Sequence, residues 1–205
     1  MSLFDVVKSV LKGASNVAAN AAANQGQRKA AMISRMEQQI RTFERNNPNM
    51  TTEQRKMIAE KKQRIQQMRE QMREEGYDEH GNLGGKTFSQ WDSMWKCIGP
   101  LLSANLTPYN HSVGLYKHVI DGKIVYIGRA IEYNNGGLRK RLSDYRREGD
   151  SAREHQSGQS IYNNLDKITT YVLVVGSDEK AAEMTKKLEP MFIAKYQPSF
   201  NRNFK

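Results

Sequence analysis

The segment Gly114–Ala130, which reads "GLYKHVIDGKIVYIGRA", decides how the second half of this 205-residue chain folds. Two short apolar runs, each with a glycine and a tyrosine, flank the dipeptide Asp121-Gly122. An Asp-Gly pair between two apolar runs is a strong short-range signal for a β-hairpin. The sequence therefore predicts antiparallel strands over residues 113–119 and 123–128.

The length of the hairpin loop determines where the two tyrosines point. A three-residue loop over 120–122, with Gly122 left-handed, places Tyr116 opposite Tyr126 on one sheet face, because side chains alternate along a strand. A two-residue turn pairs Tyr116 with Ile127 instead and puts the tyrosines on opposite faces. A joint function for the tyrosines thus predicts the three-residue loop, whereas packing is the ordinary role of a strand tyrosine.

Further periodic segments complete an α+β region over residues 108–205. The run "ITTYVLVV" at 168–175 is β-branched and typical of a buried strand. The other expected elements are a basic helix at 138–147, a helical turn at 160–165, and a final helix from 178 to about 196 with Ser177 as its cap. We therefore expect a small central sheet, antiparallel or mixed, flanked by helices.

The N-terminal part of the chain reads as helical. Residues 1–26, rich in Ala and Asn, predict a weakly amphipathic helix or a tail. Residues 27–76 carry two apolar seams at helical spacing, separated by "NNPN" at 46–49 and a capping-box pair, Thr51 and Gln54. The seam residues are Ile33, Met36, Ile40 and Phe43, then Ile58, Ile65, Met68 and Met72. Two helices joined by a short loop form an antiparallel hairpin, here called the arm.

The arm is basic. Twelve Lys and Arg face seven Glu between residues 28 and 75, which gives a net charge of +5. A solvated helix face of mixed sign is the simpler interpretation. The more specific interpretation is that the arm binds a phosphate backbone or a partner helix, which could belong to a second copy of the chain. Residues 77–107 then predict a glycine-rich linker and a short apolar packing helix from Phe88 to Ile98.

Composition restricts the partners and the compartment. A net charge of +10 and a pI near 9.7 favour polyanions such as nucleic acid. The single cysteine, Cys97, excludes an intrachain disulfide and a cysteine metal site, and it fits a reducing, cytoplasmic location. No apolar run approaches about 18 residues, and the N-terminus, with Asp5 in its apolar part, reads poorly as a signal peptide. We expect no membrane association.

Three blocks in order resemble the GIY-YIG nuclease family. The first is Gly114-Leu115-Tyr116, followed ten residues on by Tyr126-Ile127-Gly128. The second is "LRKRLSDY", with Leu138, Arg141 and Tyr145 in the family's basic-helix pattern. The third is "LEPMFIAKYQPSFN", which supplies Glu189, Pro198 and Asn201. The resemblance covers about residues 108–205, and its spacing is similar to that of the incision domain of the bacterial excision-repair nuclease.

Phosphodiester hydrolysis needs an activated water, stabilisation of negative charge in the transition state, and help for the leaving oxygen. Glu189 is the carboxylate that we assign to one divalent ion, Mg²⁺ or Mn²⁺, with water as the other ligands. Arg141 keeps its charge at working pH and can fork onto a phosphate, and the resemblance also puts the catalytic arginine there. The resemblance implies a general base at Tyr116 and orientation of water or phosphate by Tyr126.

Neighbouring residues are expected to support this chemistry. Arg129 directly follows the second block and is expected to contact phosphate or a catalytic water. Because a free tyrosine titrates at about pH 10, Tyr116 needs a cation beside it, Arg129 or Arg141, to act as a base. His118 shares a strand face with Tyr116, and His155 lies in a polar stretch; a role for either stays open. The expected substrate-binding residues are Arg139, Lys140, Tyr145, Arg146, Arg147 and Asn201.

Two features depart from the family pattern. The loop "EYNNGG" at 132–137 lengthens the connection to the basic helix, which keeps Arg139 as an alternative to Arg141. Pro190 directly follows Glu189 and either kinks the last helix or marks a helix that begins nearer Glu189. The sequence thus predicts a metal-dependent endonuclease acting on DNA, with the arm for DNA or partner binding. A DNA-binding or scaffold protein that retains the fold without turnover is the alternative.

Overall fold

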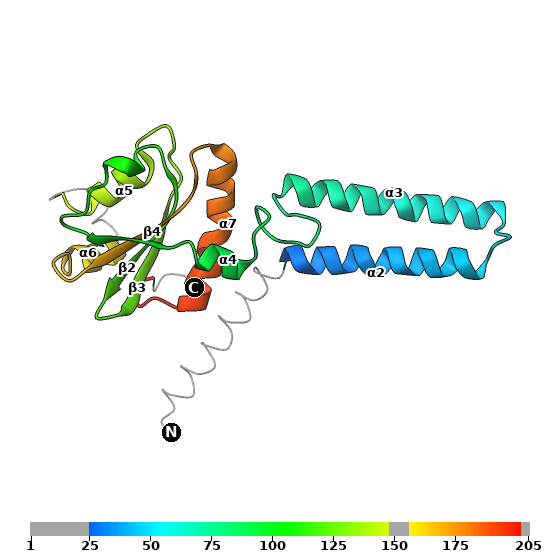
Figure 1. The fold of residues 1–205 in the computed structure, drawn as a ribbon, viewed down its shortest axis with the longest axis horizontal. Helices are drawn as coiled ribbons and strands as arrows, with labels where there is room; N and C mark the ends of the chain where they lie inside the picture. Colours follow the sequence, from blue (N-terminus) through cyan, green and yellow to red (C-terminus); the bar gives the residue numbers. More distant parts are fainter. Residues whose placement is uncertain (1–24, 148–155, 202–205) are drawn as a thin grey trace, which may run out of the picture. The chain divides into compact units, whose positions relative to one another are not determined.

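The computed structural model describes residues 25–147 and 156–201, and these fall into two compact units, one up to Gln90 and one from Trp91 onward. The first unit is built on the arm, in which helices α2 (Gln25–Asn46) and α3 (Thr52–Glu74) run antiparallel (Figure 1). The predicted helical hairpin is therefore confirmed. The predicted helix or tail over 1–26 lies almost wholly outside the described residues.

The arm is held together by its apolar seam and by a cap at the start of α3. Five seam side chains are at most 5% exposed: Ile33, Ile40, Ile58, Ile65 and Met72. The Thr51 hydroxyl accepts from the Gln54 backbone N–H, and the Gln54 side chain accepts from the Thr51 N–H. This capping box satisfies two of the backbone donors that a helix start leaves without partners, and it starts α3 directly after the proline-containing loop.

The second unit is a four-stranded antiparallel sheet with helices on both faces (Figure 1). Its strands are β1 (Lys96–Pro100), β2 (Val113–Ile120), β3 (Lys123–Ala130) and β4 (Thr169–Gly176), in the spatial order β1-β4-β2-β3. Its helices are α5 (Gly137–Asp144), α6 (Gln156–Tyr162) and α7 (Glu179–Tyr196), with a short 3₁₀ turn at Thr107–Tyr109. The expected α+β class, with a small sheet flanked by helices, is confirmed, and the sheet contains only antiparallel pairs.

Alternation along the strands divides the core into two layers. On one face Tyr116 and Val172 pack with Leu138 and Leu142 of α5 and Ile161 of α6. The other face is covered by α7, which packs against β2, β3 and β4. Phe192 of α7 is fully buried there. The sheet therefore has two separate faces, and β3 is its edge strand beside β2.

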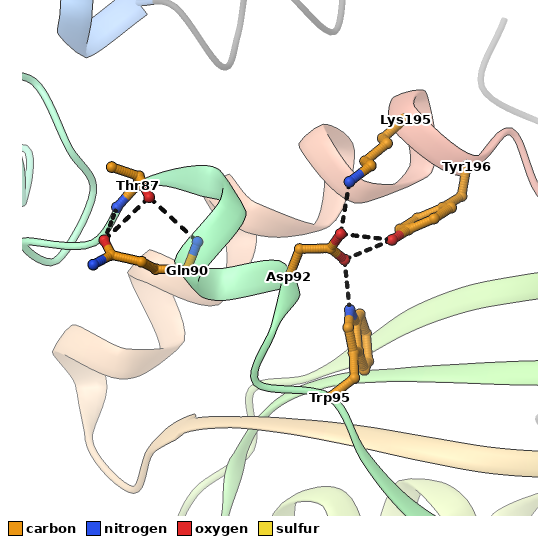
Figure 2. A network of polar contacts seen from close by, with 6 residues as sticks. All are labelled: Thr87, Gln90, Asp92, Trp95, Lys195 and Tyr196. Atoms are coloured by element: carbon orange, nitrogen blue, oxygen red, sulfur yellow. Dashed lines mark hydrogen bonds and ion pairs between the residues drawn. The ribbon is translucent and has the colours of Figure 1, made fainter.

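Four sequence-based expectations about helix ends and caps were wrong. The helix expected from Phe88 to Ile98 is only α4 (Phe88–Asp92), because the chain then extends and pairs as β1 with β4. A capping box between Thr87 and Gln90 opens this short helix (Figure 2). The last helix is capped by the side chain of Asp178, not by Ser177. The basic helix ends at Asp144, and the helical turn expected at 160–165 is α6, which ends at Tyr162.

The hairpin loop also differs from the prediction. Ile120 pairs with Lys123, so the loop has two residues, Asp121 and Gly122, both with positive φ, as a type I′ turn requires. A bulge then adds Val125 to β3, so that Tyr116 lies opposite Gly128 and Tyr126 lies opposite His118. This extra residue shifts the register of β3 by one position, which offsets the one-residue difference between a two-residue and a three-residue loop. The two tyrosines thus share one face, although the loop is shorter than predicted.

Asp92 ties the start of the second unit to the end of α7. Its Oδ1 accepts hydrogen bonds from Trp95 Nε1 at 3.2 Å and from the Tyr196 hydroxyl at 2.6 Å, and its Oδ2 accepts from Lys195 Nζ at 2.6 Å (Figure 2). Burial opposes ionisation of this carboxyl, but Lys195, Tyr196 and Trp95 together lower the pKa of Asp92. The first and last elements of the unit are therefore joined by one charged group.

None of the described helices is both long enough and apolar enough to cross a membrane.

Candidate active site

A cluster of three tyrosines and one histidine occupies the α5 face of the sheet. The hydroxyl groups of Tyr116 and Tyr145 are 2.9 Å apart. The Tyr116 ring centroid lies 6.0 Å from those of both Tyr126 and Tyr145, and the His118 ring stacks on Tyr126 at 5.9 Å. Tyr116 is 2% exposed, whereas Tyr126 is only half-buried. Tyr126 is therefore the member of the cluster that a substrate reaches more easily.

Gly128 makes room for the central tyrosine. A Cβ atom at this position would lie 2.5 Å from Tyr116 Cζ and from its hydroxyl oxygen, and 2.8 Å from Tyr126 Cε1. Any side chain here would displace both rings, because contacts under about 3 Å between such atoms are strongly repulsive. The glycine of the second block is thus required sterically by the tyrosine opposite it.

Burial keeps Tyr116 in its neutral form. Burial is the largest cause that raises the pKa of Tyr116, Tyr145 and Tyr126 raise it further, and the charge of Arg141 only partly opposes the shift. Of the two arginines that the sequence offered as neighbours, Arg141 is the one beside Tyr116. The phenol therefore acts as a hydrogen-bonding group at neutral pH, and this state does not favour the general-base role that the sequence implied for Tyr116.

His118 is completely buried inside the same cluster. Its Nδ1 lies 3.0 Å from the Thr170 hydroxyl on β4, and its Nε2 is buried with no hydrogen-bond partner among the described residues. Burial lowers the pKa of His118 to about 3. The imidazole is therefore neutral in the folded protein at any pH at which the protein is ordinarily handled.

This burial predicts an acid-dependent loss of stability. Below pH about 6.5 the unfolded chain protonates this histidine while the folded chain does not, so the free energy of unfolding falls as the pH falls. We expect His118 to contribute a loss of about 2–3 kcal/mol between pH 7 and pH 4.5. Urea unfolding at both pH values should show a correspondingly smaller loss for His118→Asn than for the wild type. His111→Asn, at an exposed histidine with positive φ, is the matched control and should keep the wild-type loss.

Arg129 and Glu189 form an ion pair on the other face of the sheet. Arg129 is one residue out of phase with Gly128, so it faces α7, and its Nη1 lies 2.5 Å from Glu189 Oε2. Glu189 is only 9% exposed, and the Arg129 side chain is 41% exposed. Burial raises the pKa of Glu189, while Arg129 and Arg141 oppose that rise. The pair is a nearly buried carboxylate with a guanidinium at the surface.

Arg141 is held by a carboxylate from the loop that precedes its helix. Its Nη2 donates to Glu132 Oε1 at 2.5 Å, and Glu132 Oε2 accepts from the Ile131 N–H at 3.0 Å. The Glu132 carbonyl oxygen also accepts from the N–H groups of Asn135 and Gly137. Burial opposes ionisation of Glu132, but Arg141 and the backbone donors lower its pKa overall. The 132–137 loop thus folds around Glu132 and fixes the direction of Arg141.

The charge of Arg141 acts on a buried group of each sheet face. Its positive charge counteracts the rise in pKa that burial causes at Tyr116 on one face and at Glu189 on the other. The candidate site residues thus lie on both sides of β3: the tyrosine cluster and Arg141 on the α5 side, and the Arg129–Glu189 pair on the α7 side. Such a group combines hydroxyl donors, two guanidinium groups and one carboxylate, which is a set suited to a phosphate ester.

The expected substrate-binding residues lie in different surroundings. Tyr145 belongs to the buried cluster, and Arg146 donates to the Ala104 carbonyl at 2.7 Å, so it ties α5 to the preceding loop. Asn201 bonds twice to the backbone of Ile127 on β3, at 2.9 and 2.7 Å, and its side chain thereby fastens the segment after α7 to the sheet edge. Three others are exposed at the surface, namely Arg139, Lys140 and Arg147, and Arg139 contacts Asn110. His155 lies outside the described residues.

Pro190 does not mark a helix start. Helix α7 runs through it from Glu179 to Tyr196, so Glu189 projects from the second half of a long helix. The alternative in which the helix begins nearer Glu189 is wrong. Proline removes one backbone hydrogen bond from the turn around it.

The carboxylate at Glu189 fits a hard divalent ion in donor type. Among the described residues, Arg129 is the one hydrogen-bond partner of this carboxylate and it uses Oε2, which leaves Oε1 for another ligand. Across residues 25–147 and 156–201, no three His, Cys, Asp or Glu side chains gather as a metal site. An ion at Glu189 would therefore have one protein ligand and take most of its coordination from water and substrate oxygens, as Mg²⁺ commonly does.

Two contributors were missed from the sequence. Glu132 was quoted only as part of a loop, and a carboxylate nine residues before a candidate catalytic arginine was the signal that could have identified it. Gly128 was read as part of a motif, and its steric role becomes visible only when β2 and β3 are in register.

No protein-family model matches this sequence, and neither the curated proteins nor the solved structures contain a significant match to it.

Proposed function

We propose that the second unit is a GIY-YIG-type endonuclease that hydrolyses phosphodiester bonds of DNA in the presence of a divalent metal ion. The observation that carries the proposal is the packing of Tyr116 with Tyr126 on one side of β3, beside helix α5 with Arg141, and the pairing of Glu189 with Arg129 on the other side. These residues come from three motif blocks that are separated along the chain. Packing alone does not require two arginines and a nearly buried carboxylate at one strand end.

In this proposal the chain's own residues orient the phosphate and balance its charge. Arg141, fixed by Glu132, forks onto the phosphate oxygens and stabilises the negative charge that grows in the transition state. Tyr126, half-buried and in contact with the cluster, orients a water or a phosphate oxygen. Tyr116 remains neutral and supports Tyr126 through ring packing, while its hydroxyl pairs with that of Tyr145.

Glu189 would hold Mg²⁺ or Mn²⁺, and a bound ion would supply a more acidic water and neutralise phosphate charge. Burial raises the pKa of this carboxyl, and the charge and hydrogen bond of Arg129 oppose that rise. Its partly exposed guanidinium can also turn toward a phosphate oxygen. The pair thus has two uses, as a support for the carboxylate and as a second cation near the substrate.

The test is incubation of purified protein with supercoiled plasmid in Mg²⁺, in Mn²⁺ and in EDTA. Nicking or linearisation that requires the ion is expected, followed by loss of that activity in Glu189→Ala protein. Cleavage that persists in EDTA would contradict the metal-dependent mechanism. Protein that shifts DNA on a gel and never cleaves plasmid, branched DNA or single strands would favour the alternative, a binding or scaffold protein with this fold.

A further inference from the structure

The arm carries a large excess of positive charge that its own acidic residues do not neutralise. Four of its twelve cations pair with glutamates: Lys29 with Glu75, Lys62 with Glu44, Arg69 with Glu37 and Arg73 with Glu70. The other eight form no salt bridge within the described part of the chain, and all eight are exposed. Arg35, Arg41, Arg45 and Arg55 are among these eight.

The apolar surface of the arm is already used within the hairpin. Its seam residues pack between α2 and α3. In the described part of the arm, the exposed large apolar side chains are Met32 and Met57, on different helices. A stable interface with a second copy or a partner helix needs a continuous apolar stripe. The described surface of the arm carries cations instead of such a stripe. Charge complementarity therefore favours a polyanion as the binding partner of the arm.

The length of the arm suits a nucleic-acid duplex. Helices of 22 and 23 residues span roughly 33–35 Å, which is about one turn of B-form DNA. Exposed arginines occur on both helices and on both sides of the loop at 47–51. Long flexible cations spread over one helical turn contact phosphates without reading bases.

We propose that the arm binds the phosphate backbone of duplex DNA through its exposed arginines, independently of base sequence, and so adds to the affinity of the cleavage site. This inference deepens the proposed function, because DNA is the substrate there. It assigns binding to the first unit and chemistry to the second. The substrate class is a duplex of at least about one turn.

The experiment measures binding of the full-length protein to a fluorescein-labelled 20-base-pair duplex by anisotropy, in EDTA, at several salt concentrations. The test variant changes Arg35, Arg41, Arg45 and Arg55 to Gln. The matched control changes Lys96, Lys123, Lys167 and Lys180 to Gln, which removes the same charge from exposed positions of the second unit. Far-ultraviolet circular dichroism checks that both variants keep their helices.

We expect the arm variant to bind at least about tenfold more weakly at 150 mM salt and to reduce the slope of log K against log salt by about 3–4. The control should change both quantities much less. Equal losses in both variants, or unchanged binding by the arm variant, would overturn the inference. A dimer in sedimentation that the arm variant dissociates, without a change in DNA affinity, would instead identify a self-association surface. Because binding is measured in EDTA, an inactive nuclease that binds through the arm would disprove only the proposed chemistry.

Discussion

Glu189→Gln protein is expected to nick supercoiled plasmid at least about a hundredfold more slowly than the wild type. The amide has the shape of the carboxylate and can still accept from Arg129, but it lacks the negative charge that a divalent ion requires. The fold should persist, since the partner that loses its counter-charge is an arginine whose side chain is 41% exposed. The measurement is the initial rate of conversion from supercoiled to nicked plasmid across a range of Mg²⁺ concentrations.

Glu183→Gln is the matched control for this experiment. Glu183 lies on the same helix, is exposed, and pairs with Lys186 within one turn. The same chemical change there should leave the nicking rate and its Mg²⁺ dependence unaltered. If Glu189→Gln and Glu183→Gln both nick at the wild-type rate, Glu189 does not hold the ion.

Arg141→Ala is expected to lower the nicking rate by roughly 10²–10³-fold, mainly through the rate of the chemical step. Arg141→Lys should lose less, because it keeps the positive charge but cannot fork onto two phosphate oxygens. Neither change should greatly affect stability, since Glu132 and Arg141 are both partly exposed. Single-turnover rates with each variant, together with DNA affinity, separate a loss of chemistry from a loss of binding.

Arg139→Ala decides between the two arginines of this helix. Arg139 is exposed and contacts Asn110, and the structure shows no link from it to the tyrosine cluster within the described residues. We expect it to lose much less activity than Arg141→Ala. A larger loss at Arg139 would reverse the assignment that the loop length at 132–137 left open.

The sequence predicted the hairpin and the shared face of its tyrosines, but it did so through the wrong loop. Alternation is a local rule that links loop length to sheet face only when no bulge follows, and here a bulge does. The bulge at Val125 depends on how β3 meets β2 and on the segment after α7, where the Phe200 N–H donates to the Val125 carbonyl at 2.8 Å. Contacts between residues 75 positions apart leave no periodic trace in a single sequence.

The mistake at residues 93–100 has a similar cause. Phe88, Trp91, Trp95 and Ile98 are spaced like one face of a helix, and the spacing alone predicts one. The partner that makes β1 a strand is β4, whose paired residues lie 69 to 76 positions further along the chain. Pairing with a distant strand thus overrode the helical spacing of these residues, which is common for short apolar segments.

The structure adds relations between the candidate site residues that their order along the chain does not give. The Tyr116 and Tyr126 rings pack together, and Arg129 pairs with Glu189. Alternation along β3 already places Arg129 on the opposite face from Tyr126, and therefore from Tyr116 once the tyrosines share a face. What the sequence could not show is that Tyr116 is buried, which changes its pKa and therefore the chemistry open to it.

The strand order has a consequence for the sequence of events during synthesis on the ribosome. The arm consists of two helices that follow each other in the chain, so it can form once about 75 residues have emerged. In contrast, β1 pairs with β4, and Asp92 bonds to Lys195 and Tyr196 near the end of α7. The second unit therefore cannot complete its fold until these late segments have left the exit tunnel. Until β4 has emerged, β1 has no strand partner and its backbone groups are bonded to water. Slowing the ribosome between residues 100 and 170 should therefore lower the yield of the second unit more than that of the arm.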